Sequence, residues 1–286
     1  MNKSDSFITT EKQIKQMKKL NYAFAILAFS LTTIVACNNR EKKENTLKVG
    51  VVTGPEKELA ETAKKVAKEK FNLDVELVAF NDYVVPNEAL NQGDIDVNVF
   101  QHQPYLQEQS KQRGFTKLTI VGNTFVFPIV AYSKKIKTIT ELQPGATIAI
   151  PNDPTNGGRS LLLLQREGII GLKENVGIQP KVTDIVSNPK QVKIIEMEAP
   201  QLPRVLDDPQ VVVAIINNSF ASQAGLDPEK QGLFTEDKES PYVNLIVARA
   251  DNKNDEKVQQ FIQSYQSPEV EATAKKVFKN GAIKGW

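Results

Sequence analysis

The sequence predicts an α/β protein built from two lobes. From residue 47 onward, short β-rich apolar runs alternate with amphipathic helical patterns, which is typical of βαβ units and mostly parallel sheets. The unbroken apolar run at residues 211–216 indicates a strand that is buried on both faces. Because the strands fall into two groups, we expect two sheets, with the chain crossing between them near residues 122–130 and 236–245.

The first lobe is expected to comprise residues 47–125 together with 246–286. Its expected strands are 47–52, 75–80, 95–100 and 118–121, and its expected helices are 56–70, 86–91, a segment from about residue 104, 256–265 and 268–278. In the helix at 56–70, Leu59, Ala63 and Val66 recur at the spacing of one buried helix face.

The second lobe is expected to comprise residues 126–245. Its expected strands are 126–132, 147–150, 193–197 and 211–216, followed by a strand at 242–248 that leads back to the first lobe. The pair Gly157-Gly158 is expected to open a helix at 160–168. Ligands of parallel α/β sheets bind at the carboxyl ends of the strands, so two sheets that both present those ends would enclose a ligand cleft.

The N-terminal segment has the layout of a bacterial lipoprotein signal. Four lysines at positions 12–19 precede an apolar run at 23–36, which ends in the sequence IVAC at Cys37. The run of about 14 residues is shorter than the roughly 20 that span a bilayer. The alternative interpretations of this segment are a transmembrane anchor and a cysteine that remains a free thiol. We therefore expect a signal peptide at 1–36, acylation of Cys37 and a polar tether at 37–46, which would hold the protein on the outer side of a membrane.

Composition excludes several classes of function. The chain has 36 basic and 34 acidic residues, a balance that argues against nucleic acid as a partner. Cys37 is the only cysteine and His102 the only histidine, which argues against disulfides and against a zinc site of several histidines. There is no P-loop and no GxGxxG motif, and we expect neither cofactor nor metal. A hydrolase that uses His102 with Asp82 is the enzymatic alternative, but no oriented nucleophile accompanies them.

Aromatic residues follow two of the expected strands. Phe80 and Tyr83 lie at the end of the second strand, while Phe100, His102 and Tyr105 lie at the end of the third. Four aromatic rings at two strand ends can wall an apolar slot, and aromatic rings make favourable contacts with a thioether sulfur. The alternative is that each ring belongs to the ordinary core.

A second candidate element is the loop PNDPTNGGRS, which follows the strand at 147–150. Glycines at a helix start let backbone N–H groups approach an anion, and Arg159 supplies a guanidinium that can hold a carboxylate through two hydrogen bonds. The alternative is an arginine in a salt bridge on the surface of the helix.

Two asparagines lie at or within apolar strands. Asn217 follows the strand at 211–216, and Asn244 interrupts the apolar run YVNLIV. A buried asparagine needs hydrogen-bond partners, and its amide oxygen can accept from a ligand ammonium group. For Asn217 the alternative is a helix N-cap.

Several long motifs resemble the NlpA-type lipoproteins. They are FNDYVVPNEAL, GDIDVNVFQHQPYL, VGNTFVFPI, PNDPTNGGRSLLLLQ, EAPQLPR, DKESPYVNLIVAR and the terminal GAIKGW, and the resemblance covers residues 47–286. The resemblance implies a two-lobed periplasmic-binding-protein fold that closes over methionine. It implies that the protein is the substrate-binding protein of an ABC transporter, with a permease and an ATPase as partners. We expect a monomer without enzymatic activity. A related amino acid, the D-enantiomer, a methionine-containing dipeptide and an adhesive surface role are the alternatives.

The resemblance also implies roles for individual residues. Arg159 would hold the carboxylate of the ligand, and Asn217 and Asn244 its amino group. Asn156 would contribute from the loop before Arg159. The residues expected around the ligand side chain are Phe80, Tyr83, Phe100, His102 and Tyr105. Because Asn217 and Asn218 form a doublet, either could face the ligand, and Asn217 fits the family pattern better.

Overall fold

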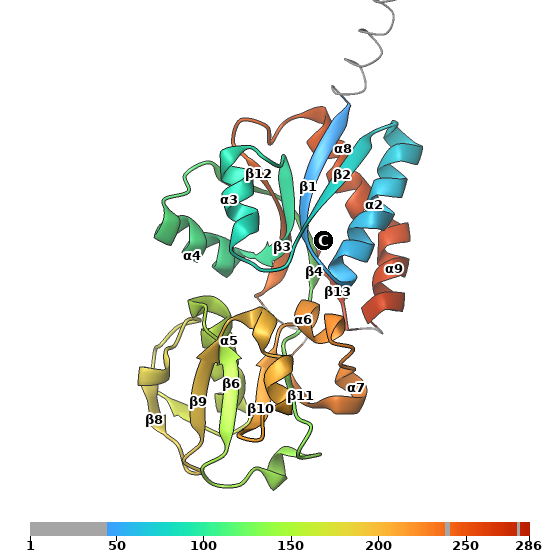
Figure 1. The fold of residues 1–286 in the computed structure, drawn as a ribbon. Helices are drawn as coiled ribbons and strands as arrows, with labels where there is room; N and C mark the ends of the chain where they lie inside the picture. Colours follow the sequence, from blue (N-terminus) through green and yellow to red (C-terminus); the bar gives the residue numbers. More distant parts are fainter. Residues whose placement is uncertain (1–44, 238–240, 279–280) are drawn as a thin grey trace, which may run out of the picture. The chain divides into compact units, whose positions relative to one another are not determined.

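The computed structural model describes residues 45–237, 241–278 and 281–286. The chain divides into residues 1–46 and a compact unit of residues 47–286, and this second unit is described below (Figure 1). The predicted signal peptide and Cys37 lie outside the described residues. None of the helices in the described ranges is both long and apolar enough to cross a membrane.

The first lobe is built on a six-stranded sheet of order β13-β4-β12-β3-β1-β2. Its strands are β1 (Thr46–Val52), β2 (Asp74–Phe80), β3 (Val97–His102), β4 (Leu118–Val126), β12 (Val243–Arg249) and β13 (Ile283–Lys284). Its helices are α2 (Pro55–Phe71), α3 (Val85–Gln92), α4 (Gln103–Arg113), α8 (Glu256–Tyr265) and α9 (Pro268–Phe278). In Figure 1, α2, α8 and α9 lie on one side of this sheet, and α3 and α4 on the other.

Helix α2 shows why these segments form helices. Pro55 occupies the first turn, Glu56 and Glu58 place acidic groups at the N-terminal end, and Lys68 and Lys70 place basic groups at the C-terminal end. Its apolar face packs against α8 and α9, in a core that includes Val97 and Phe261.

The second lobe is built on a five-stranded sheet of order β11-β5-β10-β6-β9. Its strands are β5 (Val130–Tyr132), β6 (Thr147–Pro151), β9 (Lys193–Met197), β10 (Val211–Ile216) and β11 (Gly232–Thr235), and a separate pair is formed by β7 (Gly171–Leu172) and β8 (Ile185–Ser187). Its α-helices are α5 (Pro154–Arg166), α6 (Asn218–Gln223) and α7 (Pro228–Gln231), and its 3₁₀ helices are η1 (Ile139–Glu141), η2 (Val182–Asp184), η3 (Ala199–Gln201) and η4 (Arg204–Asp207).

The α/β class is confirmed, but the sheets are mixed rather than mostly parallel. β1 with β3, and β10 with β6, pair in parallel as the βαβ pattern predicts. β12 instead inserts antiparallel between β3 and β4, because the chain enters it on returning from the second lobe. β12 begins at Val243 and lies in the first sheet along its whole length, whereas the predicted lobe boundary fell at residue 245.

Three predicted elements need correction. β4 is one strand as far as Val126, and β3 runs to His102 because its end pairs with β12. Helix α5 begins at Pro154, well before the predicted start at residue 160, because Asp153 caps it by accepting a hydrogen bond from the backbone N–H of Asn156 at 2.9 Å.

The glycine pair therefore lies inside α5, where it lets the helix pack closely against neighbouring backbone. A Cβ atom at Gly157 would lie 2.8 Å from the carbonyl oxygen of Pro151, and one at Gly158 would lie 2.7 Å from Cα of Gln179. Only glycine fits at such distances from neighbouring backbone.

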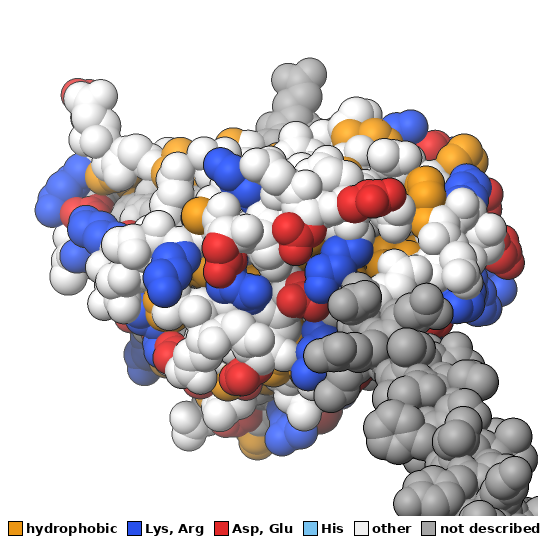
Figure 2. All heavy atoms as spheres, turned by 90° about the horizontal axis from the view of Figure 1, so that it is seen from above, with side chains coloured by type: hydrophobic (Ala, Val, Ile, Leu, Met, Phe, Trp, Pro, Cys, Tyr) orange, Lys and Arg blue, Asp and Glu red, His pale blue; other side chains and the backbone are white. Residues whose placement is uncertain are grey.

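The surface seen in Figure 2 carries basic and acidic side chains interspersed with one another. This distribution agrees with the near balance of charge in the sequence.

Candidate functional site

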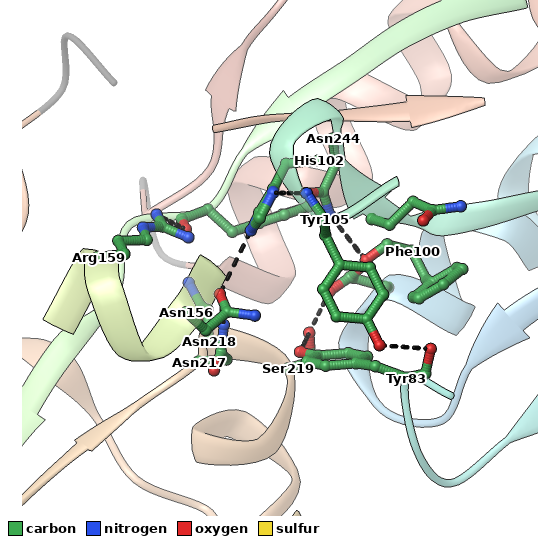
Figure 3. A pocket seen from close by; sticks show the side chains of 13 residues that line it. Tyr83, Phe100, His102, Tyr105, Asn156, Arg159, Asn217, Asn218, Ser219 and Asn244 are labelled. Carbon is green, nitrogen blue, oxygen red and sulfur yellow. Dashed lines mark hydrogen bonds between the residues drawn. The ribbon is translucent and has the colours of Figure 1, made fainter. Parts of the chain in front are cut away.

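A cavity lies between residues of the two lobes (Figure 3). The lining residues are Glu56, Tyr83, Phe100, Gln101, His102, Tyr105, Phe127, Asn156, Arg159, Asn217, Asn218, Ser219 and Asn244.

All but one of the predicted site residues line this cavity. The exception is Phe80, which packs with Val78 against the core cluster that contains Leu90 and Ile95. Residues two apart on a strand share a face, so Phe80 follows Val78 into that core, while Tyr83 on the turn beyond β2 reaches the cavity.

Three rings form an aromatic wall. The centroids of Tyr83 and Phe100 lie 5.9 Å apart in a stacked arrangement, and Tyr105 meets both rings edge-on at 6.0 Å. The hydroxyl of Tyr105 donates to the carbonyl oxygen of Tyr83 at 2.9 Å, and Phe220 of the second lobe contacts Tyr83 at 4.8 Å. The wall is therefore mostly apolar, and the second lobe covers it.

His102 is a neutral, orienting residue. It caps α4, where its Nδ1 accepts from the backbone N–H of Tyr105 at 3.2 Å, so that Nε2 carries the proton and donates to Oδ1 of Asn156 at 3.3 Å. Burial, with a further contribution from the positive charge of Arg159, lowers the pKa of His102 to about 3. Its two ring nitrogens are thus engaged in holding the helix cap and the neighbouring amide.

A chain of amides fixes the orientation of Asn217. The Asp153 carboxylate accepts from Nδ2 of Asn156 at 3.0 Å, and Oδ1 of Asn156 accepts from Nδ2 of Asn217 at 2.9 Å. Among the described residues, Oδ1 of Asn217 is buried without a hydrogen-bond partner. In the neighbouring Asn218 the amide oxygen accepts from Ser222 at 3.0 Å. Asn217 therefore presents the free acceptor of the doublet.

Arg159 is 4% exposed and is bound on one edge by protein groups. Its Nε donates to Oε1 of Glu236 at 2.8 Å, and its Nη2 donates to Oε2 of Glu236 and to the carbonyl oxygen of Phe127 at 3.0 Å. The ring of Tyr242 lies 4.3 Å from its guanidinium carbon. A guanidinium has five N–H groups, and the two on Nη1 have no hydrogen-bond partner in the described part of the chain, so they are available to a ligand.

Arg159 has a buried partner that the sequence did not predict. Its Nε and Nη2 are bound to Glu236, and this ion pair is buried rather than on a helix surface. Arg159 also contacts both segments that join the lobes, because Phe127 follows β4 and Glu236 follows β11.

Five lining residues were not among the predicted ones: Glu56, Gln101, Phe127, Asn218 and Ser219. Glu56 is 3% exposed; its Oε1 accepts from the Ser219 hydroxyl, and its Oε2 accepts from Nδ2 of Asn244 at 3.4 Å. Burial raises the pKa of Glu56 to about 7, although both hydrogen bonds lower it. Its place in the sequence could have identified Glu56 as a site residue, because it follows the carboxyl end of β1 just as the predicted residues follow other strands.

Taken together, the cavity offers N–H donors from Arg159, acceptors from Asn217 and Glu56, and an apolar aromatic wall. These groups complement a small zwitterion with an apolar side chain. Within the described ranges, no three His, Cys, Asp or Glu side chains are grouped so as to hold a metal ion.

Comparison with known proteins places this chain in a defined group. The chain is 63% identical over 254 residues to the D-methionine-binding lipoprotein MetQ of Yersinia pestis, covering 89% of this chain and 93% of that protein. The crystal structure of a methionine-binding protein MetQ matches with a TM-score of 0.83 and 64% identity, over 85% of this chain and 98% of that one.

Two further structures show the same fold. A periplasmic substrate-binding protein of an ABC transporter from Coxiella burnetii matches with a TM-score of 0.80 and 46% identity, over 84% of this chain and all (100%) of that one. A nutrient-binding protein from Burkholderia cenocepacia, bound to methionine, matches with a TM-score of 0.81 and 48% identity over the same shares, 84% and 100%. The predicted periplasmic-binding-protein fold is thus confirmed. Since the model of the NlpA lipoproteins matches residues 47–286, the chain belongs to the NlpA lipoprotein family.

Proposed function

We propose that this protein is the lipid-anchored substrate-binding protein of an ABC transporter and that it binds methionine for uptake. The observation that carries the proposal is the cavity itself, where the unpaired amide oxygen of Asn217 and the free N–H groups of Arg159 lie beside an aromatic wall. The names of the similar proteins, which include methionine-binding lipoproteins, support the same ligand.

The ligand would be held at three places. Its carboxylate accepts from Nη1 of Arg159, and its ammonium group donates to the amide oxygens of Asn217 and Asn244. The Nδ2 of Asn244 donates to the carbonyl oxygen of Phe100 at 3.2 Å, so its oxygen is the atom left to face a donor. His102 and Asn156 hold these groups in place.

The side chain of methionine would lie along Tyr83, Phe100 and Tyr105. Contacts between a thioether sulfur and an aromatic ring contribute about 0.3–1.5 kcal/mol each, and an unbranched chain fits a narrow apolar slot. Neither feature of the wall depends on the configuration at the α-carbon, so the L- and D-enantiomers are both candidates.

The rest of the chain would serve delivery. Residues 1–36 act as a signal peptide, acyl chains such as palmitate on Cys37 hold the monomeric protein at the periplasmic or extracytoplasmic face, and residues 37–46 act as the tether. The hydroxyl of Tyr83 donates to Ser219 of the second lobe at 3.3 Å, so the two lobes are in contact across the cavity. The closed shape of the two lobes around a ligand is what the permease and ATPase complex would recognise. No catalytic step is proposed.

The first test identifies the ligand. The full-length protein, purified in detergent, is denatured and any released small molecule is identified by mass spectrometry. The refolded, ligand-free protein is then titrated calorimetrically with L-methionine, D-methionine, glycyl-methionine and leucine. We expect saturable binding of methionine at one site. Preference for leucine or the dipeptide would overturn the assignment of the substrate, and binding of none of them would overturn the transport role.

The second test addresses the site. Asn217→Ala removes an acceptor for a charged donor, and such a hydrogen bond contributes about 1.5–3 kcal/mol, or roughly tenfold to hundredfold in affinity. The matched control is Asn254→Ala, an exposed asparagine in the turn before α8. Unchanged affinity of Asn217→Ala for methionine would contradict the placement of the ligand.

A further inference from the structure

Among the residues that the structure describes, Glu56 is a buried acid without a cationic partner. Its hydrogen-bond donors, Ser219 and Asn244, are both neutral. The guanidinium in the same cavity, that of Arg159, pairs with Glu236 instead. A buried carboxylate is costly unless an opposite charge compensates it, so the cavity contains one acid that lacks its counter-charge.

The contacts of Glu56 fix where a cation could bind. Ser219, which occupies Oε1, itself accepts from the hydroxyl of Tyr83 at 3.3 Å, and Nδ2 of Asn244 occupies one position on Oε2. Each carboxylate oxygen can accept a second hydrogen bond. An ammonium group has three N–H donors, and the cavity lining offers it the Glu56 carboxylate, the unpaired amide oxygen of Asn217 and the side chain of Asn244.

We propose that Glu56 is the charged acceptor for the α-ammonium group of the ligand and that it restricts the site to ligands with a free amino group. The inference rests on the proposed function in one respect, namely that an amino acid occupies this cavity. An N-acylated or peptide-linked methionine has no cation at this nitrogen and would leave the buried carboxylate uncompensated. The ligands selected by Glu56 are therefore those with a free α-amino group at this position.

The same geometry predicts release of a proton on binding. Burial raises the pKa of Glu56 to about 7 in the free protein, and a bound ammonium group lowers it again. The titratable or charged groups around Glu56 are Tyr83, Tyr265 of α8, His102 and Arg159; the two phenols have raised pKa values, and His102 is neutral above about pH 3. Glu56 is therefore the group that gives up its proton near neutral pH.

The test compares Glu56→Gln with Glu58→Gln, an exposed glutamate in the same turn of α2. The full-length proteins are titrated with L-methionine and with 4-(methylthio)butanoate, which lacks the amino group. We expect Glu56→Gln to lower the affinity for methionine by about tenfold or more. Its affinity for the desamino analogue should be unchanged or higher, and Glu58→Gln should change neither affinity. If Glu56→Gln lowers the affinity for both ligands equally, or leaves the affinity for methionine unchanged, the proposal is overturned.

A measurement on the unaltered protein makes the test independent of whether the variant folds. Calorimetric titration at pH 6 in two buffers of different ionisation enthalpy counts the protons released, and we expect close to one per methionine, with the affinity falling about tenfold per pH unit below 7. No proton release and a flat pH profile would overturn the role of Glu56. If the unaltered protein does not bind methionine at all, the proposed function fails instead.

Discussion

The buried pair of Arg159 and Glu236 allows a quantitative prediction about stability. Arg159 is 4% exposed and the Glu236 side chain 14%, so replacing one partner leaves a mostly desolvated charge on the other. Breaking such a pair costs about 3–5 kcal/mol, and an arginine-to-methionine change also frees the carbonyl oxygen of Phe127. With about 2–4 °C per kcal/mol for a domain of this size, Arg159→Met should lower Tm by about 6–20 °C.

The double variant separates the charge effect from lost packing. Replacement of a buried ion pair by neutral groups is often close to neutral, so Arg159→Met with Glu236→Gln should recover most of the stability that either single change loses. The assay is urea unfolding of the four ligand-free proteins, analysed as a double-mutant cycle. If the loss of unfolding free energy in the double variant equals the sum of the two single losses to within about 0.5 kcal/mol, the two side chains are not coupled and the reasoning is wrong. The double variant should still fail to bind methionine, since it lacks the Nη1 donors.

Three further predictions address the fold and its pH dependence. Leu59→Ala, in the core between α2 and α8, should lower the free energy of unfolding by about 2–5 kcal/mol in urea titrations, whereas Val186→Ala on an exposed strand should change it little. Gly158→Ala should lower Tm, because its Cβ meets the backbone of Gln179; an unchanged Tm would contradict the packing described for α5. Ligand-free stability should fall as the pH rises from about 4.5 to about 7, because folding raises the pKa of Glu56 to about 7 and the folded state then binds more protons than the unfolded state. Glu56→Gln should remove this slope, and a slope that persists would exclude Glu56 as its source.

Local patterns in the sequence predicted most of the fold and the cavity. The alternation of strands and helices identified the α/β class, and the rule that ligands meet the carboxyl ends of strands selected residues such as Tyr83 and Asn217. These rules succeed because periodicity and position after a strand are properties of short segments. The rule applied equally to Glu56, but an acid in the first turn of a helix is so common for electrostatic reasons that it drew no attention.

What could not be predicted depends on contacts between distant segments. Glu236 lies 77 positions from Arg159, and no local pattern links the two. The insertion of β12 between β3 and β4 is likewise a consequence of how the chain returns, and it is this pairing that extends β3 to His102. The side to which Phe80 points follows from the pleat of β2 once the sheet is formed.

The attachment of Arg159 to both joining segments has a consequence for how affinity can change. One guanidinium holds the carbonyl oxygen of Phe127 in one segment and the carboxylate of Glu236 in the other, and Arg159 also lines the cavity. Occupancy of the cavity and the geometry of the joining segments are thus thermodynamically linked, and such linkage is reciprocal. A substitution in either segment can therefore change the affinity for the ligand without contacting it. Relatives with identical cavity residues can differ in affinity through substitutions in these segments.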